Sequence, residues 1–128
     1  VEKYLAQQQL IQPNYTFYEH MPIMITQNDY NLGLYNGDIG IVRKDEKGIL
    51  KVWFIDNEAE RTVKAVLPGF INQYETVYAM TIHKSQGSEF NEVLILLPHT
   101  ESKILTKELI YTGVTRAKQK VYIRDLMV

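Results

Sequence analysis

The side chains best suited to binding or catalysis are concentrated in one stretch, residues 79–90, which reads AMTIHKSQGSEF. Gly and Ser suffice for a turn, but a His, a Lys, a Gln and a Glu beside them exceed what turn geometry requires. Gly87 allows a phosphate or sugar to approach the backbone closely. Gln86 and Ser85 can exchange hydrogen bonds with a ligand, and Glu89 can accept from a ribose hydroxyl. The alternative is an ordinary surface loop, because loops are polar by default.

A second candidate is Arg116, which lies within YTGVTRAKQK at residues 111–120. Its guanidinium is planar and always charged, so it can offset the charge that develops on a transferred phosphoryl group. The alternative is a surface arginine on an amphipathic helix. Arg116 taken alone does not separate these two interpretations.

The sequence lacks the parts that would complete a nucleotide site. No glycine begins a GxxxxGK[ST] phosphate loop, there is no GxGxxG, and no acidic pair follows a buried strand to hold magnesium. His20, His83 and His99 lack metal-ligand spacing, so no metal site is predicted. The chain therefore carries half of a nucleotide site, and the other half must come from elsewhere.

Composition limits the class of protein. In 128 residues, 14 Lys and Arg oppose 15 Asp and Glu, for a formal net charge of -1, so any contact with a polyanion must be local. The absence of Cys excludes disulfides and thiolate zinc sites and fits a reducing compartment. No signal peptide or apolar run of roughly 20 residues is present, so we expect a cytoplasmic protein without membrane contact. The first residue is Val rather than Met, which predicts a piece of a longer protein.

Two patterns of hydrophobicity alternate along the chain. Apolar runs predict strands at residues 21–26, 76–81, 93–98 and 121–125, and EVLILLP at 92–98 lacks alternation, as expected for a strand buried on both faces of a mostly parallel sheet. A helix is predicted near 106–118, with Thr106 as its N-cap, and another at 1–11, ended by Pro13. These elements predict an α/β layer with the polar loop beyond the carboxyl end of strand 76–81.

A different texture fills the middle of the chain. Three β-like runs at 38–43, 49–55 and 61–66 are separated by short polar turns, which predicts a small antiparallel barrel. We therefore expect an α/β domain at 1–29 and 73–128, interrupted by a β-barrel at 30–72. In the barrel, Trp53 or Tyr35 is either a stacking platform for bases or a packed aromatic.

The stretches together closely resemble a known family. AMTIHKSQGSEFNEVLILLP followed by ELIYTGVTRAKQKVYI resembles motifs V and VI of superfamily 1 helicases, and MPIMITQNDYNLGLYNGDIGIV resembles the lead-in to the accessory SH3-like domain of the RecD type. The resemblance runs from about residue 16 to 124. It implies the second RecA-like motor domain with an inserted SH3-like barrel, from the C-terminal part of a RecD-type helicase, the family that contains the alpha subunit of exodeoxyribonuclease V. It also implies 5′ to 3′ unwinding in DNA recombination and repair.

The resemblance also assigns roles to particular residues. It implies that Arg116 is the arginine finger that reaches the γ-phosphate across the motor cleft. It further implies nucleotide contacts from Gln86, Gly87 and Glu89, and contacts with the DNA backbone from Thr81, His83 and Lys84. Lys84 and Ser88 could instead be solvated surface residues, Thr115 could serve only to orient the helix, and Tyr111 could belong to the core.

Cofactors and partners follow from the same resemblance. It implies that the full-length protein uses ATP and Mg²⁺, while this chain alone binds no cofactor and is inactive. The expected partners are single-stranded DNA, the N-terminal motor domain of the same protein, and the RecB and RecC subunits. The alternative is a free-standing nucleic-acid-binding or protein-binding barrel without ATPase activity, whose α/β portion is only a scaffold.

Overall fold

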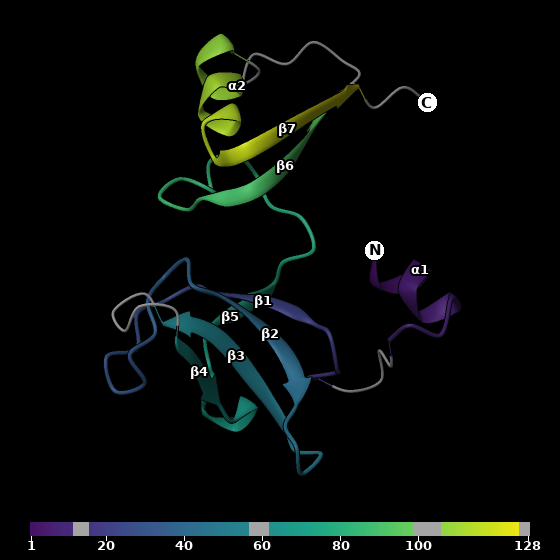
Figure 1. Ribbon diagram of the computed structural model, residues 1–128, viewed down its shortest axis with the longest axis vertical. Helices are drawn as coiled ribbons and strands as arrows, with labels where there is room; N and C mark the ends of the chain where they lie inside the picture. The colour runs from purple at the N-terminus through teal and green to yellow at the C-terminus, as the bar shows by residue number, and fades with distance from the viewer. Residues whose placement is uncertain (12–15, 57–61, 99–105, 126–128) are drawn as a thin grey trace. The chain divides into compact units, whose positions relative to one another are not determined.

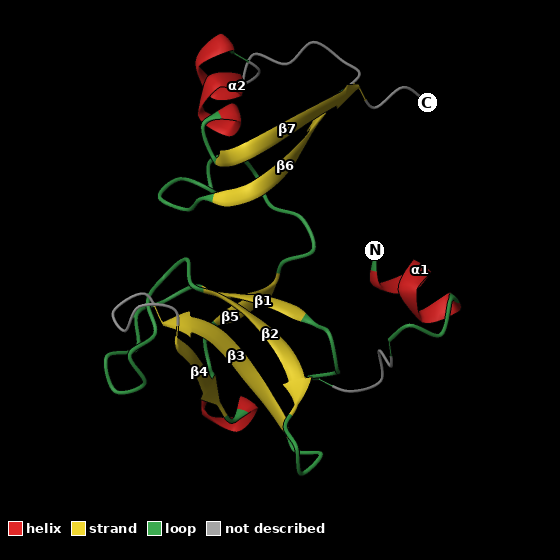
Figure 2. Cartoon of the chain, in the orientation of Figure 1, coloured by secondary structure: helices red, strands yellow, loops and turns green. Residues whose placement is uncertain are grey.

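The computed structural model describes residues 1–11, 16–56, 62–98 and 106–125. The chain divides into two compact units, Val1–Tyr78 and Ala79–Val128. Figure 1 follows the elements along the chain, and Figure 2 separates helices from strands.

The first unit is built on a five-stranded antiparallel sheet with the order β4-β3-β2-β1-β5. A short helix precedes the sheet and a 3-10 turn lies between its last two strands. The elements are α1 (Glu2–Gln7), β1 (Pro22–Ile25), β2 (Ile39–Lys44), β3 (Leu50–Asp56), β4 (Thr62–Val66), η1 (Pro68–Phe70) and β5 (Tyr74–Thr76).

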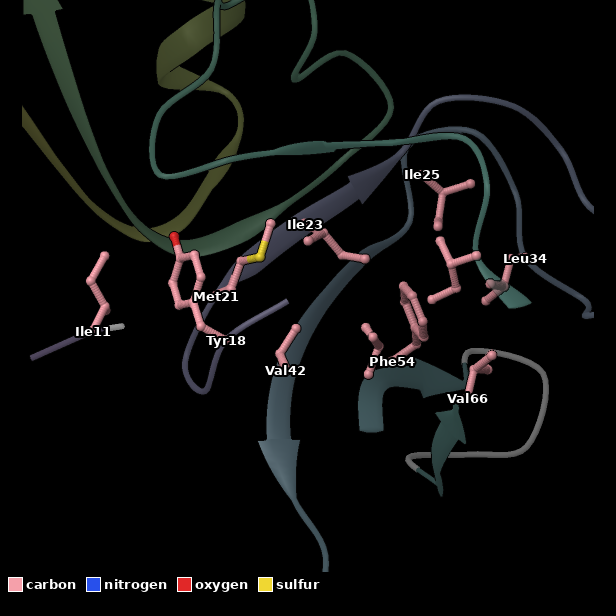
Figure 3. Packing of buried hydrophobic residues seen from close by; sticks show 11 residues of the cluster. Ile11, Tyr18, Met21, Ile23, Ile25, Leu34, Val42, Phe54 and Val66 are labelled. Atoms are coloured by element: carbon pink, nitrogen blue, oxygen red, sulfur yellow. The ribbon is translucent and has the colours of Figure 1, made fainter. Parts of the chain in front are cut away.

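Alternating side chains form the core of this unit. In β3, Val52 and Phe54 are buried, while Ile55 is exposed, which is the period of two expected for a strand with one face inward. Figure 3 shows Ile23 of β1 and Val42 of β2 in the same cluster as Phe54. Because Ile23, Val42 and Val52 are 0% exposed, they form the fully buried centre of the unit.

Local hydrogen bonds fix the connections. Asp45 in the β2–β3 turn accepts from the backbone N–H groups of Lys47 and Ile49 at 2.9 Å and pairs with Lys51 at 3.0 Å. The hydrogen bond from Ile49 and the ammonium of Lys51 hold the pKa of the Asp45 carboxyl below its usual value. Asp45 therefore closes the hairpin that the polar KDEKG sequence predicted.

A pair of tyrosines links distant parts of the first unit. The hydroxyls of Tyr18 and Tyr78 lie 2.8 Å apart. Burial, followed by the hydrogen bond with Tyr78, raises the pKa of the Tyr18 phenol above its usual value. Tyr18 is therefore a neutral core residue whose hydroxyl has a partner, as buried tyrosines require.

Two predicted strands differ from the α/β layer expected for them. Residues 22–25 form β1, which pairs antiparallel with β2 and β5 and so does not belong to a parallel sheet. The predicted strand at 76–81 is also wrong, because β5 spans Tyr74–Thr76 and belongs to the same antiparallel sheet. Ile23, Met24 and Ile25 are all buried. The unbroken apolar run thus correctly predicted a strand that is buried on both faces, but it did not predict the direction of that strand.

The predicted N-terminal helix is shorter than expected. It ends at Gln7, and Gln9 has a φ of +58°, outside the helical region. The expected stop at Pro13 lies outside the described residues. Leu5 and Ala6 pack against the core, whereas Val1 is 71% exposed.

The second unit is a β-α-β arrangement. It contains β6 (Phe90–Leu97), α2 (Lys107–Val114) and β7 (Ala117–Asp125), and β6 pairs with β7 in parallel. The predicted strands at 93–98 and 121–125, the helix near 106–118 and the parallel pairing are confirmed. The expected burial of residues 92–98 on both faces is wrong, because Leu94 is 57% and Leu96 is 52% exposed. Thr106 is the N-cap of α2, and its hydroxyl accepts from the Leu109 N–H at 3.1 Å.

The fold is therefore α/β, with an antiparallel sheet and a parallel pair. The SH3-like barrel at 30–72 and the motor domain at 1–29 and 73–128 stay predictions. In the described part of the chain, no helix could cross a bilayer.

The packing of Gly40 gives a test of the first unit. A Cβ added to Gly40 in β2 would lie 2.6 Å from Phe54 Cε1 and 2.8 Å from Val52 Cγ1, inside the core. We expect Gly40→Ala to lower the free energy of unfolding by about 1 to 3 kcal/mol through overpacking. Urea unfolding followed by the fluorescence of Trp53, the single tryptophan of the chain, measures this. The control is Gly69→Ala, whose Cβ would meet no atom within 4 Å. Equal unfolding midpoints for the two variants would contradict the prediction.

Candidate functional site

The polar stretch forms a compact turn over Ile82–Gly87 that leads into β6. The backbone N–H of Ser85 donates to Thr81 O at 3.2 Å and to Ile82 O at 3.1 Å, and Lys84 N donates to the Thr81 hydroxyl at 3.1 Å. Ser88 N then donates to Ser85 O at 3.0 Å. The backbone of the turn is thus held by its own hydrogen bonds, which fixes the directions of the side chains.

Ser85 and Gly87 have different parts in this turn. Ser85 is 7% exposed, and its hydroxyl donates to Ile82 O at 2.6 Å. Ser85 is therefore a buried support, and it is not free to bind a ligand as the sequence suggested. Gly87 has a φ of +85° and no atom within 4 Å of its missing Cβ position. Its backbone is open to an approaching ligand, and its left-handed conformation favours glycine.

Gly113 is the point where helix α2 packs most closely on the turn. A Cβ at this position would lie 3.0 Å from Ile82 Cδ1 and 3.0 Å from Ile95 Cδ1. Gly113 is buried, and it is the only buried residue of α2 among those described. The missing side chain therefore lets the helix contact both the polar turn and strand β6.

Arg116 follows this close contact and is held against the same turn. Its Nε donates to Thr112 O at 3.2 Å, one Nη donates to Ser88 O at 3.4 Å, and the other donates to Thr115 Oγ1 at 3.3 Å. The Thr115 hydroxyl in turn donates to Thr112 O at 2.9 Å. Arg116 thus has a defined orientation, unlike a solvated surface arginine. Two of its three bonds are longer than the usual N–H···O distance, so a stronger acceptor could displace them.

Backbone and charge interactions join the two motifs. The Phe90 N–H donates to Arg116 O at 2.8 Å, and Phe90 is the register partner of Ala117. Lys118 Nζ lies 3.8 Å from Glu89 Oε2, with both side chains more than half exposed. An exposed pair of this kind contributes little to stability, but it marks Glu89 and Arg116 as neighbours on one edge of the unit.

The polar loop lies at a different end of the strands from the one that the sequence predicted. The sequence placed the polar loop beyond the carboxyl end of a parallel strand. The turn instead lies at the amino end of β6, and Arg116 immediately precedes the amino end of β7. Because the two strands run parallel and pair from Phe90 and Ala117 onward, both motifs meet at one edge.

The predicted site residues are on the surface. Arg116 is partly buried, and the others are exposed: Thr81, His83, Lys84, Gln86, Gly87 and Glu89. Exposed amide, imidazole and carboxylate groups beside a guanidinium can bind a polar, charged ligand such as a nucleotide or a phosphodiester. Among the described residues, no group of three or more His, Asp or Glu could hold a metal ion.

Sequence reasoning missed the residues that support the site. Ser88 acts through its carbonyl oxygen, which bonds Arg116, and Gly113 acts through the side chain that it lacks. A backbone acceptor leaves no signal in residue type. Gly113 within a helical segment was a signal, because an isolated glycine in a helix often marks close packing. Tyr111 was a candidate core residue, but it is 71% exposed, so that interpretation is wrong.

Comparisons with known proteins agree on one family. Residues 76–124 match the family model of the UvrD-like helicase C-terminal domain. The chain is 42% identical over 123 residues to RecBCD enzyme subunit RecD of Mycobacterium tuberculosis, covering 96% of this chain and 21% of that protein. It is 45% identical over 107 residues to the Haemophilus influenzae subunit of the same name, covering 84% of this chain and 15% of that protein.

A further relative and two solved structures extend the comparison. The ATP-dependent RecD2 DNA helicase of Deinococcus radiodurans is 35% identical over 100 residues, which is 78% of this chain and 13% of that protein. Bacteroides Pif1 bound to single-stranded DNA covers 91% of this chain with a TM-score of 0.54 and 19% identity, over 32% of its own length. Pif1 from Bacteroides with ADP-AlF₃ and single-stranded DNA covers 99% with a TM-score of 0.56 and 18% identity, over 38% of its length. At these identities the two structures show the fold alone.

The chain spans about a fifth or less of the curated RecD proteins it matches. Within that span the similarity covers nearly all of the chain, and the helicase C-terminal model covers both the polar turn and Arg116. This chain therefore belongs to the RecD family of superfamily 1 helicases, of which it carries a helicase C-terminal region.

Proposed function

We propose that the full-length protein is an ATP-dependent DNA helicase that acts in recombination and repair, and that this chain supplies motifs V and VI to its ATP site. The observation that carries the proposal is the hydrogen bond from Arg116 to Ser88 O, which brings the guanidinium beside the polar turn. A nucleotide bound along Gln86, Gly87 and Glu89 would lie next to a cation that can reach its phosphates. The same juxtaposition is hard to explain for a solvated loop.

Each group of the proposed ATP site has a chemical task. Arg116 offsets charge on the γ-phosphoryl group, as arginine fingers do. The backbone at Gly87 and the amide of Gln86 contact the nucleotide, and Glu89 accepts from a ribose hydroxyl. Glu89 lies near Lys118 in the unliganded chain, so ribose would compete with a weak ion pair only.

ATP and Mg²⁺ must be held mainly by another part of the protein. The sequence has no phosphate loop and no acidic pair for magnesium. In the proposal an N-terminal motor domain of the same protein holds the phosphates and the metal ion, and the present chain completes the site. The chain alone is then inactive.

The DNA strand is proposed to contact the start of the turn. Thr81 and His83 are exposed, and both precede the nucleotide-facing residues in one hydrogen-bonded turn. A change in the position of Gln86 or Gly87 on nucleotide binding would therefore be transmitted to the DNA contacts through that backbone. Lys84 adds a cation to the same segment.

The wider setting of the proposal rests on the relatives. Two of them are named as RecBCD enzyme subunits. These names support the proposal that the full-length protein has RecB and RecC as partners and is part of exodeoxyribonuclease V. They also support a cytoplasmic location. Unwinding in the 5′ to 3′ direction is proposed from the family resemblance. The match of residues 76–124 to a helicase domain favours this function over a free-standing binding module.

The half-site predicts that the 128-residue chain does not hydrolyse ATP. Its phosphate-binding and metal-binding parts are missing from the sequence, so positioned nucleotide and water are not available. Steady-state phosphate release with and without single-stranded DNA measures this. Hydrolysis by the pure chain that rises on adding DNA would sink the half-site proposal.

The proposed DNA contact predicts weak binding that depends on His83. With a net charge of -1 the chain attracts DNA little, and each phosphate neutralised on a single strand adds about 0.7 to the salt slope. We expect His83→Ala to weaken binding of a labelled oligonucleotide, whereas Gln119→Ala, on exposed β7, should leave it unchanged. Titrations at two salt concentrations give both affinity and slope. Tight binding that is indifferent to His83→Ala would place the contact elsewhere.

The finger assignment predicts a large, specific loss of rate in the full-length protein. Arg116→Ala should lower single-turnover ATP hydrolysis by about 10³ to 10⁵, which corresponds to about 4 to 7 kcal/mol of barrier. Arg116→Lys should restore little of it, because a point charge cannot reproduce the planar fork. Thermal melting should change little, since the bonds of Arg116 are long and partly exposed.

Arg124→Ala is the matched control, because Arg124 is an exposed arginine of the same unit, on β7. It should change neither rate nor melting temperature. A loss of less than tenfold for Arg116→Ala, or a loss matched by a large fall in melting temperature, would show that Arg116 is an ordinary structural residue.

A further inference from the structure

A pocket in the first unit lies apart from the proposed helicase residues. Its volume is about 260 Å³, and it opens between the loop that follows β1 and the segment that precedes β5. Its polar walls come from four amides and one carboxylate: Gln27, Asn28, Asn72, Gln73 and Asp29. The pocket is smaller than the roughly 300 to 1,000 Å³ of sites for small organic ligands, so it suits one side chain or a group of that size.

Hydrogen bonds hold one part of the pocket wall, and another part consists of exposed amide side chains. Asn28 Oδ1 accepts from Asn36 N at 2.8 Å, and Asp29 Oδ1 accepts from Leu32 N at 3.1 Å, which fixes the loop. In the part of the chain that the structure describes, the side-chain amides of Gln27, Asn72 and Gln73 have no hydrogen-bond partner. Buried Leu34 and Ile71 lie beneath them. The pocket therefore combines exposed amide groups that a ligand can reach with buried apolar side chains.

Two exposed aromatic rings adjoin the pocket. Tyr30 is 77% exposed and Tyr35 is 43% exposed, and their ring centroids lie 6.1 Å apart in an edge-to-face arrangement. Asn28 Nδ2, in the wall of the pocket, donates to the Tyr30 hydroxyl at 3.3 Å. The two rings are in contact and open to solvent, so a ligand in the pocket can reach them. Their faces attract cations or stack on planar groups.

The local charge decides between these two kinds of partner. Residues 21–42 contain two carboxylates, Asp29 and Asp38, and neither Lys nor Arg. Among the described residues, Lys64 lies next to the loop, and its ammonium donates to the carbonyl oxygen of Leu32. A nucleic-acid strand needs cations for its phosphates, and the loop supplies carboxylates instead. The charge therefore favours a cationic ligand.

We propose that this pocket binds the guanidinium of an arginine on a protein partner. A guanidinium has five donors in a planar fork, which matches the Asp29 carboxylate and the amide oxygens around it. Its flat face can pack on Tyr30 or Tyr35. A lysine would use the carboxylate but would leave the planar fit and most of the amide oxygens unused. The proposal is independent of the ATP site.

The test uses the 128-residue chain and two short peptides that differ in charge. The probes are a capped Gly-Gly-Arg-Gly-Gly peptide and the same peptide with citrulline, which keeps the shape and loses the charge. Two-dimensional ¹H–¹⁵N NMR follows backbone amides and the side-chain amides of Gln27, Asn28, Asn72 and Gln73. We expect saturable shifts confined to residues 25–38 and 71–73 with the arginine peptide, and weaker binding of the citrulline peptide by about two- to fivefold.

Variants then test the two contacts separately. Asp29→Asn keeps the acceptor for Leu32 N and removes the charge, so it should weaken the arginine peptide by about two- to fivefold and leave the citrulline peptide unchanged. Tyr30→Leu should weaken the arginine peptide by about two- to fivefold, the effect of an exposed cation–π contact. Glu46→Gln, an exposed carboxylate in the β2–β3 turn, is the control and should have no effect. The NMR spectrum of each variant also shows whether it is folded.

Three results would overturn the proposal. Equal binding of the arginine and citrulline peptides would show that charge is not recognised. Equal weakening by Asp29→Asn and Glu46→Gln would reduce the effect to general electrostatics. Saturable shifts of the same residues with an oligothymidylate, but not with the arginine peptide, would assign the pocket to nucleic acid.

Discussion

The close packing of Gly113 on Ile82 and Ile95 is the contact on which the candidate site depends. It brings the end of α2 against the polar turn, because even a Cβ at this position would crowd the two isoleucine side chains at 3.0 Å. The Phe90 N–H then reaches Arg116 O at 2.8 Å, and the guanidinium reaches Ser88 O. The catalytic role that we propose for Arg116 requires its guanidinium to be positioned to within a fraction of an ångström. Here that position is set by a missing Cβ and by backbone hydrogen bonds.

The elements of the second unit and their parallel pairing were predicted well because the local signals agree with each other, whereas the burial of β6 on both faces was not, since Leu94 and Leu96 are exposed. The apolar run of β6 lacks alternation, α2 has a threonine N-cap, and the two strands are joined by a helix, which favours a parallel pair. The order of the two motifs along the chain then predicted that Arg116 and the polar turn belong together. That expectation required the family resemblance, because Arg116 alone looks like any surface arginine.

The first unit shows what the sequence pattern does not contain. The run MPIMIT predicts a buried strand, and β1 is buried on both faces, but burial says nothing about strand direction. The pairing of β1 with β5 joins residues about 50 positions apart, and such pairing is decided by the whole core rather than by a local pattern. The same limit explains the wrong strand at 76–81. Val77 N donates to Pro22 O at 3.0 Å, so the segment is held by the antiparallel neighbour that the sequence did not reveal.

The candidate site contains buried residues that support its structure and exposed residues that we propose contact the ligand. Ser85 and Gly113 are buried and make their contacts within the unit. Gln86, Gly87 and Glu89 are exposed, and the ion pair of Glu89 with Lys118 is weak. Substitution of the first group disturbs packing, so it changes stability together with activity. Substitution of Gln86 or Glu89 leaves the fold intact, because surface changes away from such features are usually within about 0.5 kcal/mol. Substitution of Gly87 strains the backbone instead, because its φ is +85°. Arg116 lies between the two groups, since its bonds to Thr112 O and Ser88 O orient it and are long enough to be exchanged for bonds to the phosphate that we propose as its ligand.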